Sequence, residues 1–214
     1  MVAIDQPLYE TPALRDKIRT MAKKESSLLN MIVGLGGVAL IASALLGGVY
    51  AITKEPIELA KAKKLKEAIQ LVTPEFDNDP AAEMYMLPVK NNDSLICYPT
   101  RIGGELVATA IKTYSDNGFS GRFYIMVGLD KNGTIINTAV LEHAETPGLG
   151  DKIEKKKSDW SDQFNDKNPE TSKIKVTKDG GDIDGITAST ITSRAFCEAV
   201  QQAFETYKKE GKHE

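Results

Sequence analysis

The feature that most constrains this chain is an uncharged apolar run near its N-terminus. Residues 28–52 contain no Asp, Glu, Lys or Arg. A helix rises about 1.5 Å per residue, so one of this length exceeds the ~30 Å hydrocarbon core of a bilayer. The polar members Asn30 and Ser43 are tolerated near a helix end or against a partner helix. We therefore expect one uncleaved transmembrane helix over residues 28–52.

A cleaved signal peptide is the alternative interpretation of this run. Val49, Tyr50 and Ala51 make a passable cleavage site. The apolar segment of a signal peptide is typically about 7–15 residues long, which is shorter than this run. Small residues also recur every four positions along one helix face: Ala39, Ser43, Gly47 and Ala51. A neighbouring transmembrane helix can approach such a face closely, although Gly and Ala are common in membrane helices in general.

The charges that flank the run do not decide its orientation. Five basic residues precede it: Arg15, Lys17, Arg19, Lys23 and Lys24. Five follow it: Lys54, Lys61, Lys63, Lys64 and Lys66. The positive-inside rule needs an excess on one side, so it leaves the topology open.

The composition of the whole chain is that of an ordinary globular protein. Hydrophobic residues make up 41% of the chain, charged residues 27%, and the net charge is −3. A chain this close to neutral has no electrostatic footprint for nucleic acid, so we expect no such partner. Cys97 and Cys197 form neither a zinc motif nor a disulfide framework. We expect no metal site and two separate thiols, with a single bridge as the alternative.

Local patterns predict an α+β protein in four segments: residues 1–27 with a short amphipathic helix, the span 28–52, a stalk helix or linker 53–77, and one domain 78–214. Pro56 is placed to open the stalk helix, and Pro74 to end it. Alternation and β-branched residues predict antiparallel strands over 105–113, 122–129, 134–141 and 173–178. Trp160 and Phe164 are expected to dock a helical stretch on the sheet. A 3.6-residue period predicts a long C-terminal helix.

A dense group of hydroxyls stands at the start of that last helix. Four fall within a six-residue window: Thr187, Ser189, Thr190 and Thr192. Thr190 falls in the first helical turn, where free N–H groups and the helix dipole favour an anion such as phosphate. The glycines within residues 180–185 leave the approach open. The alternative is that Thr187 or Ser189 only caps the helix, which requires one hydroxyl.

The segment 184–190, Asp-Gly-Ile-Thr-Ala-Ser-Thr, resembles the flavinylation motif of the FMN-binding domain family. That motif runs Asp, two variable residues, Ser or Thr (here Thr187), usually Gly, usually Ala, and then the acceptor Thr. Ala188 and Ser189 stand where Gly and Ala are usual, and Thr190 occupies the acceptor position. The resemblance implies that a transferase moves the FMN part of FAD onto the Thr190 hydroxyl. It also implies a role for Asp184 in recognition or activation.

A second stretch, "ETPGLGDKI" (145–153), resembles the loop that accompanies this motif in the G subunit of the Rnf electron-transport complex. The loop also occurs in the related C subunit of the sodium-pumping NADH:quinone reductase. Taken alone, it is a plain Pro-Gly turn. The resemblance implies further cofactor contacts from Glu145, Thr146, Gly148, Leu149, Gly150 and Thr192. "KKESSLLNM", "TKEPI" and "DGGDIDGIT" extend it, and the modest length favours the Rnf protein.

The resemblance implies a flavoprotein that is not catalytic alone: an electron carrier with covalent FMN in a complex that couples ferredoxin/NAD-type electron transfer to ion translocation. Its expected partners are the other integral and peripheral subunits and the FAD-using transferase. It places the N-terminus in the cytoplasm and the FMN domain outside the cell membrane. The alternatives are a C-type subunit of the quinone reductase, an anchored structural or binding module without cofactor, and a stand-alone FMN-dependent reductase.

Overall fold

The computed structural model describes residues 28–89 and 93–210. The amphipathic helix expected within residues 1–27 lies outside the described residues. Contacts divide the chain into two compact units, residues 1–58 and 59–214. The segment boundaries expected at residues 27, 52 and 77 remain predictions.

The described part of the first unit is helical and carries the apolar run. Helix α2 spans Leu28–Val72, and its residues 28–52 are all exposed. An exposed face of this apolarity is unstable in water, whereas lipid tails solvate it on every side. The helix is long and apolar enough to cross a membrane.

Pro56 lies inside α2, so the expectation of a separate helix opened by this proline is wrong. A proline in a helix interior removes one hydrogen bond and costs about 3 kcal/mol. The residues that follow it are rich in Ala, Leu, Glu and Lys, the strongest helix formers, so the helix continues through the defect. The expected end is confirmed, since α2 stops at Val72, just before Pro74.

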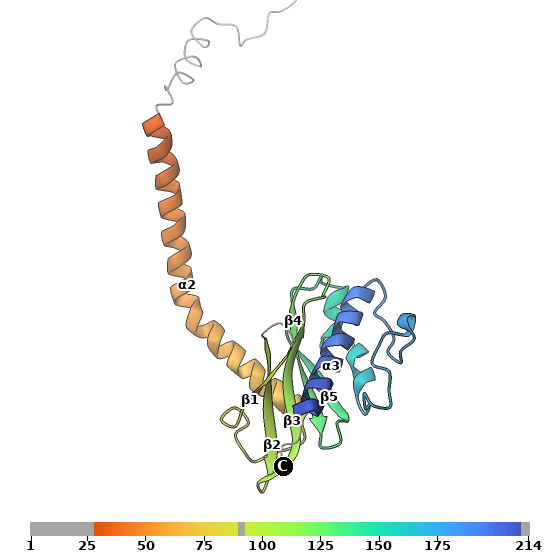
Figure 1. The fold of residues 1–214 in the computed structure, drawn as a ribbon. Helices are drawn as coiled ribbons and strands as arrows, with labels where there is room; N and C mark the ends of the chain where they lie inside the picture. Colours follow the sequence, from red (N-terminus) through yellow and green to blue (C-terminus); the bar gives the residue numbers. More distant parts are fainter. Residues whose placement is uncertain (1–27, 90–92, 211–214) are drawn as a thin grey trace, which may run out of the picture. The chain divides into compact units, whose positions relative to one another are not determined.

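The second unit is built on a five-stranded antiparallel meander in the order β1-β2-β3-β4-β5 (Figure 1). The strands are β1 Tyr85–Pro88, β2 Ser94–Ile102, β3 Glu105–Ser115, β4 Phe123–Asp130 and β5 Ile135–Glu142. The last three lie within two residues of their predicted positions, and the carbonyl of Asp130 closes the turn between β4 and β5 by accepting from the N–H of Gly133 at 3.0 Å. Sequence patterns did not predict β1 and β2.

The strand expected over 173–178 is wrong. Its residues form one parallel bridge, between Val176 and Ile183, and then a short 3-10 helix, η4, over Thr177–Asp179. Ile174 and Val176 are buried in the core while the lysines beside them are exposed. Apolar and polar residues alternate here because one side of the segment faces the core and the other faces solvent. The segment pairs with none of the five strands of the sheet.

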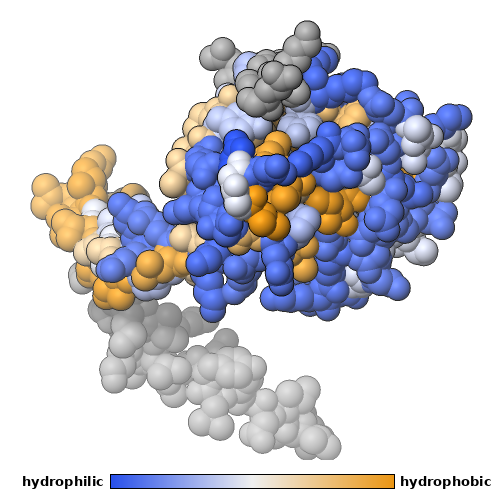
Figure 2. Space-filling view, turned by 90° about the horizontal axis from the view of Figure 1, so that it is seen from below, coloured by the Kyte–Doolittle hydropathy of each residue, from blue (hydrophilic) through white to orange (hydrophobic). Residues whose placement is uncertain are grey.

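Each face of the sheet is covered by a different helix. Helix α3, Thr190–Glu210, packs on the face of β4 that carries Phe123 and Ile125. The last turns of α2, which belong to the same unit as the sheet, pack on the opposite face against Met126. Seen from below, the surface is mostly hydrophilic, and hydrophobic residues gather in a central area bordered by hydrophilic ones and again at the left edge of the view (Figure 2).

The stretch with Trp160 and Phe164 docks on the sheet, as expected, on the face that α3 covers. These two residues are the first and the last of the 3-10 helix η3, Trp160–Phe164, and both are buried. Their ring centroids lie 5.3 and 5.1 Å from that of Phe196 in α3. This aromatic cluster fixes the first turns of α3 in place, and thereby the residues around Thr190.

Candidate functional site

Helix α3 begins at Thr190, which confirms the predicted position of this residue in the first turn. The cap is not the one the sequence suggested. The hydroxyl of Ser193 accepts from the N–H of Ile186 at 2.9 Å and donates to the carbonyl of Ser189 at 3.0 Å. Within the described residues, the hydroxyls of Thr187 and Ser189 form no hydrogen bond. The Ser193 hydroxyl therefore stabilises the start of α3, and the predicted capping hydroxyls of Thr187 and Ser189 are not used.

Ala188 adopts a left-handed backbone conformation, with φ +63°. This conformation strains any residue with a Cβ and suits glycine. It gives a physical reason why the motif usually has glycine at this position. The left-handed residue turns the chain just before α3 and leaves Thr190 half-buried at the start of the helix.

A buried carboxylate joins the two predicted halves of the site. The side chain of Glu145, in a residue only 5% exposed, accepts from the Thr192 hydroxyl at 2.8 Å and from the N–H of Ser120 at 3.2 Å. The N–H of Glu145 in turn donates to Nδ1 of His143 at 3.0 Å. Buried carboxylates need such partners, because an unpaired one is costly. Glu145 and Thr192 therefore act first as a structural link between the loop and α3.

Gly150 completes that link because it leaves room for the carboxylate. A Cβ at this position would stand 2.4 Å from Oε2 of Glu145 and 3.1 Å from the Thr192 hydroxyl. The residue lies at the start of the 3-10 helix η2, Gly150–Ile153. The resemblance implies that this glycine contacts the cofactor, and the structure adds that it packs against Glu145.

The loop and the motif meet around a cavity of about 320 Å³. The predicted residues that line it are Glu145, Thr146, Leu149, Gly150, Ala188, Ser189, Thr190 and Thr192. Phe119 and Ile191, which the sequence did not single out, complete the lining. Both are apolar residues without a distinctive motif, so only their position in space identifies them.

Three predicted residues do not line this cavity. Gly148 and Thr187 are exposed beside it. Asp184 is exposed as well, and its recorded contacts are made by its backbone. Its carbonyl accepts from the indole N–H of Trp160, and its N–H donates to the amide oxygen of Gln163 at 2.8 Å. In this structure Asp184 therefore positions the motif against η3, and its carboxylate faces solvent.

The cavity fits an amphipathic planar group beside Thr190. Its volume lies near the lower end of ligand pockets, which hold about 300–1,000 Å³. Three large apolar residues around it are unusually exposed: Phe119 is 68% exposed, Ile191 49% and Leu149 41%. A flat aromatic ring laid between them would remove apolar surface from water. The residues present are thus suited to FMN.

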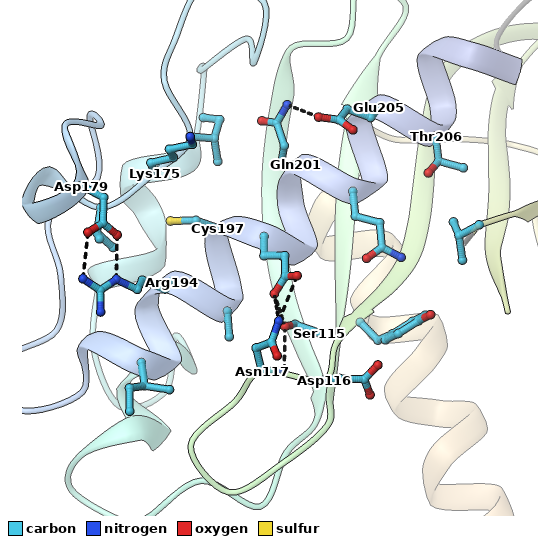
Figure 3. Close-up of a pocket in the computed structure, with 18 of the residues that line it drawn as sticks. Ser115, Asp116, Asn117, Lys175, Asp179, Arg194, Cys197, Gln201, Glu205 and Thr206 are labelled. Carbon is cyan, nitrogen blue, oxygen red and sulfur yellow. Dashed lines mark hydrogen bonds and ion pairs between the residues drawn. The ribbon is translucent and has the colours of Figure 1, made fainter. Parts of the chain in front are cut away.

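A larger hollow of about 1,150 Å³ runs along another side of α3 and does not include Thr190 in its lining. Figure 3 shows that polar side chains in it already pair with one another. Arg194 pairs with Asp179, the Asn117 amide donates to Glu198 at 2.8 Å, and Gln201 donates to Glu205. Because these groups satisfy each other, the smaller cavity is the candidate site.

Comparison with known proteins agrees with this geometry. A family model described as the FMN-binding domain matches residues 118–205, which include both the 145–150 loop and the Thr190 motif. Proteins named as the G subunit of the ion-translocating oxidoreductase complex are similar over most of the chain. The one from Aliivibrio fischeri strain MJ11 is 36% identical over 198 residues, which cover 88% of this chain and 91% of that protein.

Two further relatives with the same name show similar agreement. That of Shewanella piezotolerans is 35% identical over 189 residues, covering 84% of this chain and 89% of its own. That of Yersinia pestis is 34% identical over 194 residues, covering 87% and 90%. The quinone-reductase alternative is therefore not favoured. With an FMN-binding domain and this similarity along most of its length, the chain belongs to the family of ion-translocating oxidoreductase complex G subunits.

Proposed function

We propose that this protein carries electrons within an ion-translocating membrane complex through FMN linked to Thr190 by a phosphoester. The observation that carries the proposal is the cavity in which the half-buried Thr190 meets the Glu145–Gly150 loop. Membership of the G-subunit family and the FMN-binding domain support the same conclusion. The protein is a redox subunit of a translocase and works with other subunits.

The surroundings of the hydroxyls favour Thr190 as the attachment point. Thr192 is fully buried and donates to Glu145, and Ser189 is also buried. Thr187 is exposed but does not line the cavity. Thr190 alone among these four residues both lines the cavity and is open enough for a large group to reach its oxygen.

Attachment at Thr190 is a phosphoryl transfer that balances with FAD as the donor. The Thr190 oxygen forms a bond to the flavin-side phosphorus, the bond to the diphosphate bridging oxygen breaks, and AMP leaves. The hydroxyl proton passes to a base of the transferase. The first-turn N–H groups of α3 face the negative charge of the product. A transferase that uses FAD is therefore a required partner during maturation.

Bound FMN supplies one- and two-electron transfer, and the protein determines its position and surroundings. The tether at Thr190 prevents loss of the flavin whatever its redox state. Leu149 and Ile191 line the cavity with apolar side chains. The Glu145–Thr192 hydrogen bond keeps the loop and α3 together, so the cavity has a fixed width.

The protein is a membrane protein with one candidate span in α2. The charge balance around the span leaves its orientation undecided, and family resemblance supports an N-terminus in the cytoplasm and a flavin domain on the outer side. This orientation can be tested with an impermeant amine reagent on intact cells. Labelling of exposed lysines such as Lys156 before lysis agrees with the outer location, and labelling only after lysis contradicts it.

The proposal is tested by the fluorescence of the denatured full-length protein on a gel, after expression with the transferase. We expect flavin fluorescence that migrates with the chain and is lost in Thr190→Val. The matched control Thr177→Val, which alters an exposed hydroxyl outside both the motif and the cavity, keeps it. A colourless wild-type band would favour the module without cofactor. Purification of the flavoprotein without other membrane subunits would favour the stand-alone reductase.

A further inference from the structure

We propose that Lys178 is the cation that holds the phosphodiester of the flavin on Thr190. The inference rests on the proposed attachment and adds a positioning residue to it. The ammonium nitrogen of Lys178 lies 3.4 Å from Oγ1 of Thr190, the oxygen that receives the phosphorus. Twelve residues separate the two along the chain, so the contact is made by the fold and not by local sequence.

The segment that carries Lys178 is a tight loop with a fixed backbone. The N–H of Gly180 bonds to the carbonyl of Thr177 at 3.0 Å, and the N–H of Thr177 bonds to the carbonyl of Ile183 at 2.7 Å. Gly180 is left-handed at φ +77°, and a Cβ on Gly181 would stand 2.1 Å from the Lys175 carbonyl. The sequence suggested that these two glycines leave the approach to α3 open. In the structure they also allow the turn that brings Lys178 to Thr190.

A two-bond ion pair fastens this loop to α3. The guanidinium of Arg194 donates to the two carboxylate oxygens of Asp179 at 2.7 and 2.8 Å (Figure 3). The hydrogen bond from Arg194 lowers the pKa of Asp179 below its ordinary value, so the carboxylate stays ionised at neutral pH. Arginine–carboxylate pairs with two hydrogen bonds have a fixed geometry. The Arg194–Asp179 pair therefore sets the position of Lys178, the residue next to Asp179.

The same ion pair leaves the charge of Lys178 available. Asp179 is the acidic neighbour of Lys178 in the chain, and its two oxygens are already bonded to Arg194. In residues 28–89 and 93–210, Lys178 lies within salt-bridge distance of no carboxylate, although its charge acts on Asp179 from further away, and its hydrogen bond goes to Thr190. A phosphodiester on Thr190 adds one negative charge within reach of this ammonium group. Lysine is well suited to bind phosphate as a point charge.

Lys178 meets the phosphate from the loop side, while the first-turn N–H groups of α3 meet it from the helix side. The ammonium group therefore also reduces the repulsion between the incoming FAD diphosphate and its surroundings during attachment. Loss of this charge should slow attachment and change the environment of the phosphorus in the product. Neither effect requires a change in the fold, since Lys178 is exposed.

The test compares Lys178→Gln and Lys178→Arg with the control Lys175→Gln, which removes an exposed cation of the same segment without a recorded contact to Thr190. Full-length proteins are incubated with FAD and the transferase, and linked flavin is measured over time. We expect Lys178→Gln to slow attachment by about tenfold or more, as loss of a charged hydrogen bond does. Lys178→Arg restores most of the rate, and Lys175→Gln stays within about twofold of wild type.

A second readout is the ³¹P chemical shift of the linked flavin in protein loaded to completion. Lys178→Gln should shift it, and Lys175→Gln should leave it unchanged. An unchanged rate and ³¹P signal in Lys178→Gln, or an equal loss in Lys175→Gln, overturns the role of Lys178. If wild type itself acquires no flavin on Thr190, the proposed function has failed instead, and the two failures are thereby distinguished.

Discussion

At the scale of single residues, each hydroxyl around the start of α3 has a different environment. Ser193 bonds to the backbone before the helix, and Thr192 bonds to the buried Glu145. Within residues 28–89 and 93–210, the Thr190 hydroxyl hydrogen-bonds only to Lys178, and the residue lies at the cavity. The surplus of hydroxyls in this segment therefore divides into structural members and the proposed acceptor, Thr190. The sequence could propose Thr190 from motif resemblance, but the roles of Ser193 and Lys178 depend on contacts that no local pattern encodes.

Replacing the strained Ala188 by glycine should stabilise the protein. The left-handed conformation of an L-residue costs about 1–2 kcal/mol, and glycine removes this cost. The greater conformational entropy of glycine in the unfolded chain cancels about half of the benefit, so we expect the free energy of unfolding to rise by about 0.5–1 kcal/mol. Urea unfolding of Ala188→Gly measures it. The control Ala144→Gly, at an exposed position without positive φ, should lose stability. An equal loss of unfolding free energy in both variants would show that the backbone of Ala188 is not strained.

Filling the space at Gly150 should damage both the fold and the site. A methyl group there would stand 2.4 Å from Glu145 Oε2, so Gly150→Ala must displace the Glu145–Thr192 pair. We expect a loss of about 1–3 kcal/mol and less linked flavin, measured by thermal unfolding and flavin absorbance. Gly185→Ala is the control, because nothing lies within 4 Å of a Cβ there. If Gly150→Ala has the same stability and linked flavin as Gly185→Ala, the proposed contact between position 150 and Glu145 is contradicted.

At the scale of elements, the end of α2 lies directly against the middle of β4. A Cβ on Gly128 would stand 1.7 Å from the carbonyl oxygen of Val72, so this strand position admits only glycine. Ala68 and Ile69 complete the contact. The last turns of the helix are thus part of the folded domain. The sequence predicted a helix here but could not show which surface it packs against, because Gly128 is an inconspicuous residue inside a strand.

Gly128→Ala should separate the end of α2 from the sheet. The overlap is with backbone, which cannot rotate away as a side chain does, so we expect a loss of about 3 kcal/mol or more in unfolding free energy. Thermal unfolding measures the loss. Adding Val72→Ala should give no rescue, because the closest overlap is with the carbonyl oxygen, and alanine keeps the Cβ that would lie 3.0 Å away. Recovery of stability in the double variant would show that side-chain packing is responsible.

The two cysteines, in β2 and α3, should behave as protonated buried thiols. Burial raises the pKa of both Cys97 and Cys197 from 9.0 to about 12. A raised folded pKa means that the associated stability is complete below about pH 9 and is lost as the pH rises toward 12. At pH 8 we expect a maleimide reagent to label neither thiol in the folded protein and both in denaturant. A bridge between them would leave both unlabelled after denaturation without reductant.

At the scale of the whole molecule, sequence patterns predicted the elements that carry a strong local signal. These are strands β3 to β5 with their β-branched and aromatic residues, helix α3 with its 3.6-residue period, and the uncharged apolar span. Strand β1 has only four residues, and β2 contains Pro99, so neither has a clear strand signal. Residues 173–178 alternate because one side is buried, although no strand pairs with them. Long-range contacts therefore decide what local periodicity leaves open.

The candidate site shows the same division between local and long-range information. Its two segments could be identified from the sequence, since the loop at 145–150 and the motif at 184–190 each resemble a family pattern. Their convergence on one cavity could not, because it depends on how α3 packs on the sheet. The apolar members Phe119 and Ile191 carry no motif and are recognised only by their exposure beside that cavity.

The central claim is that the cofactor is linked to Thr190. The most direct test is peptide mass mapping of residues 179–194 from full-length protein made in cells that contain the FAD-using transferase. The predicted result is a peptide that carries the mass of one FMN joined through its phosphate, and fragmentation of this peptide places the addition on Thr190. The same peptide from Thr190→Val is unmodified. An unmodified wild-type peptide, or an addition on Thr187, Ser189 or Thr192, would contradict the claim.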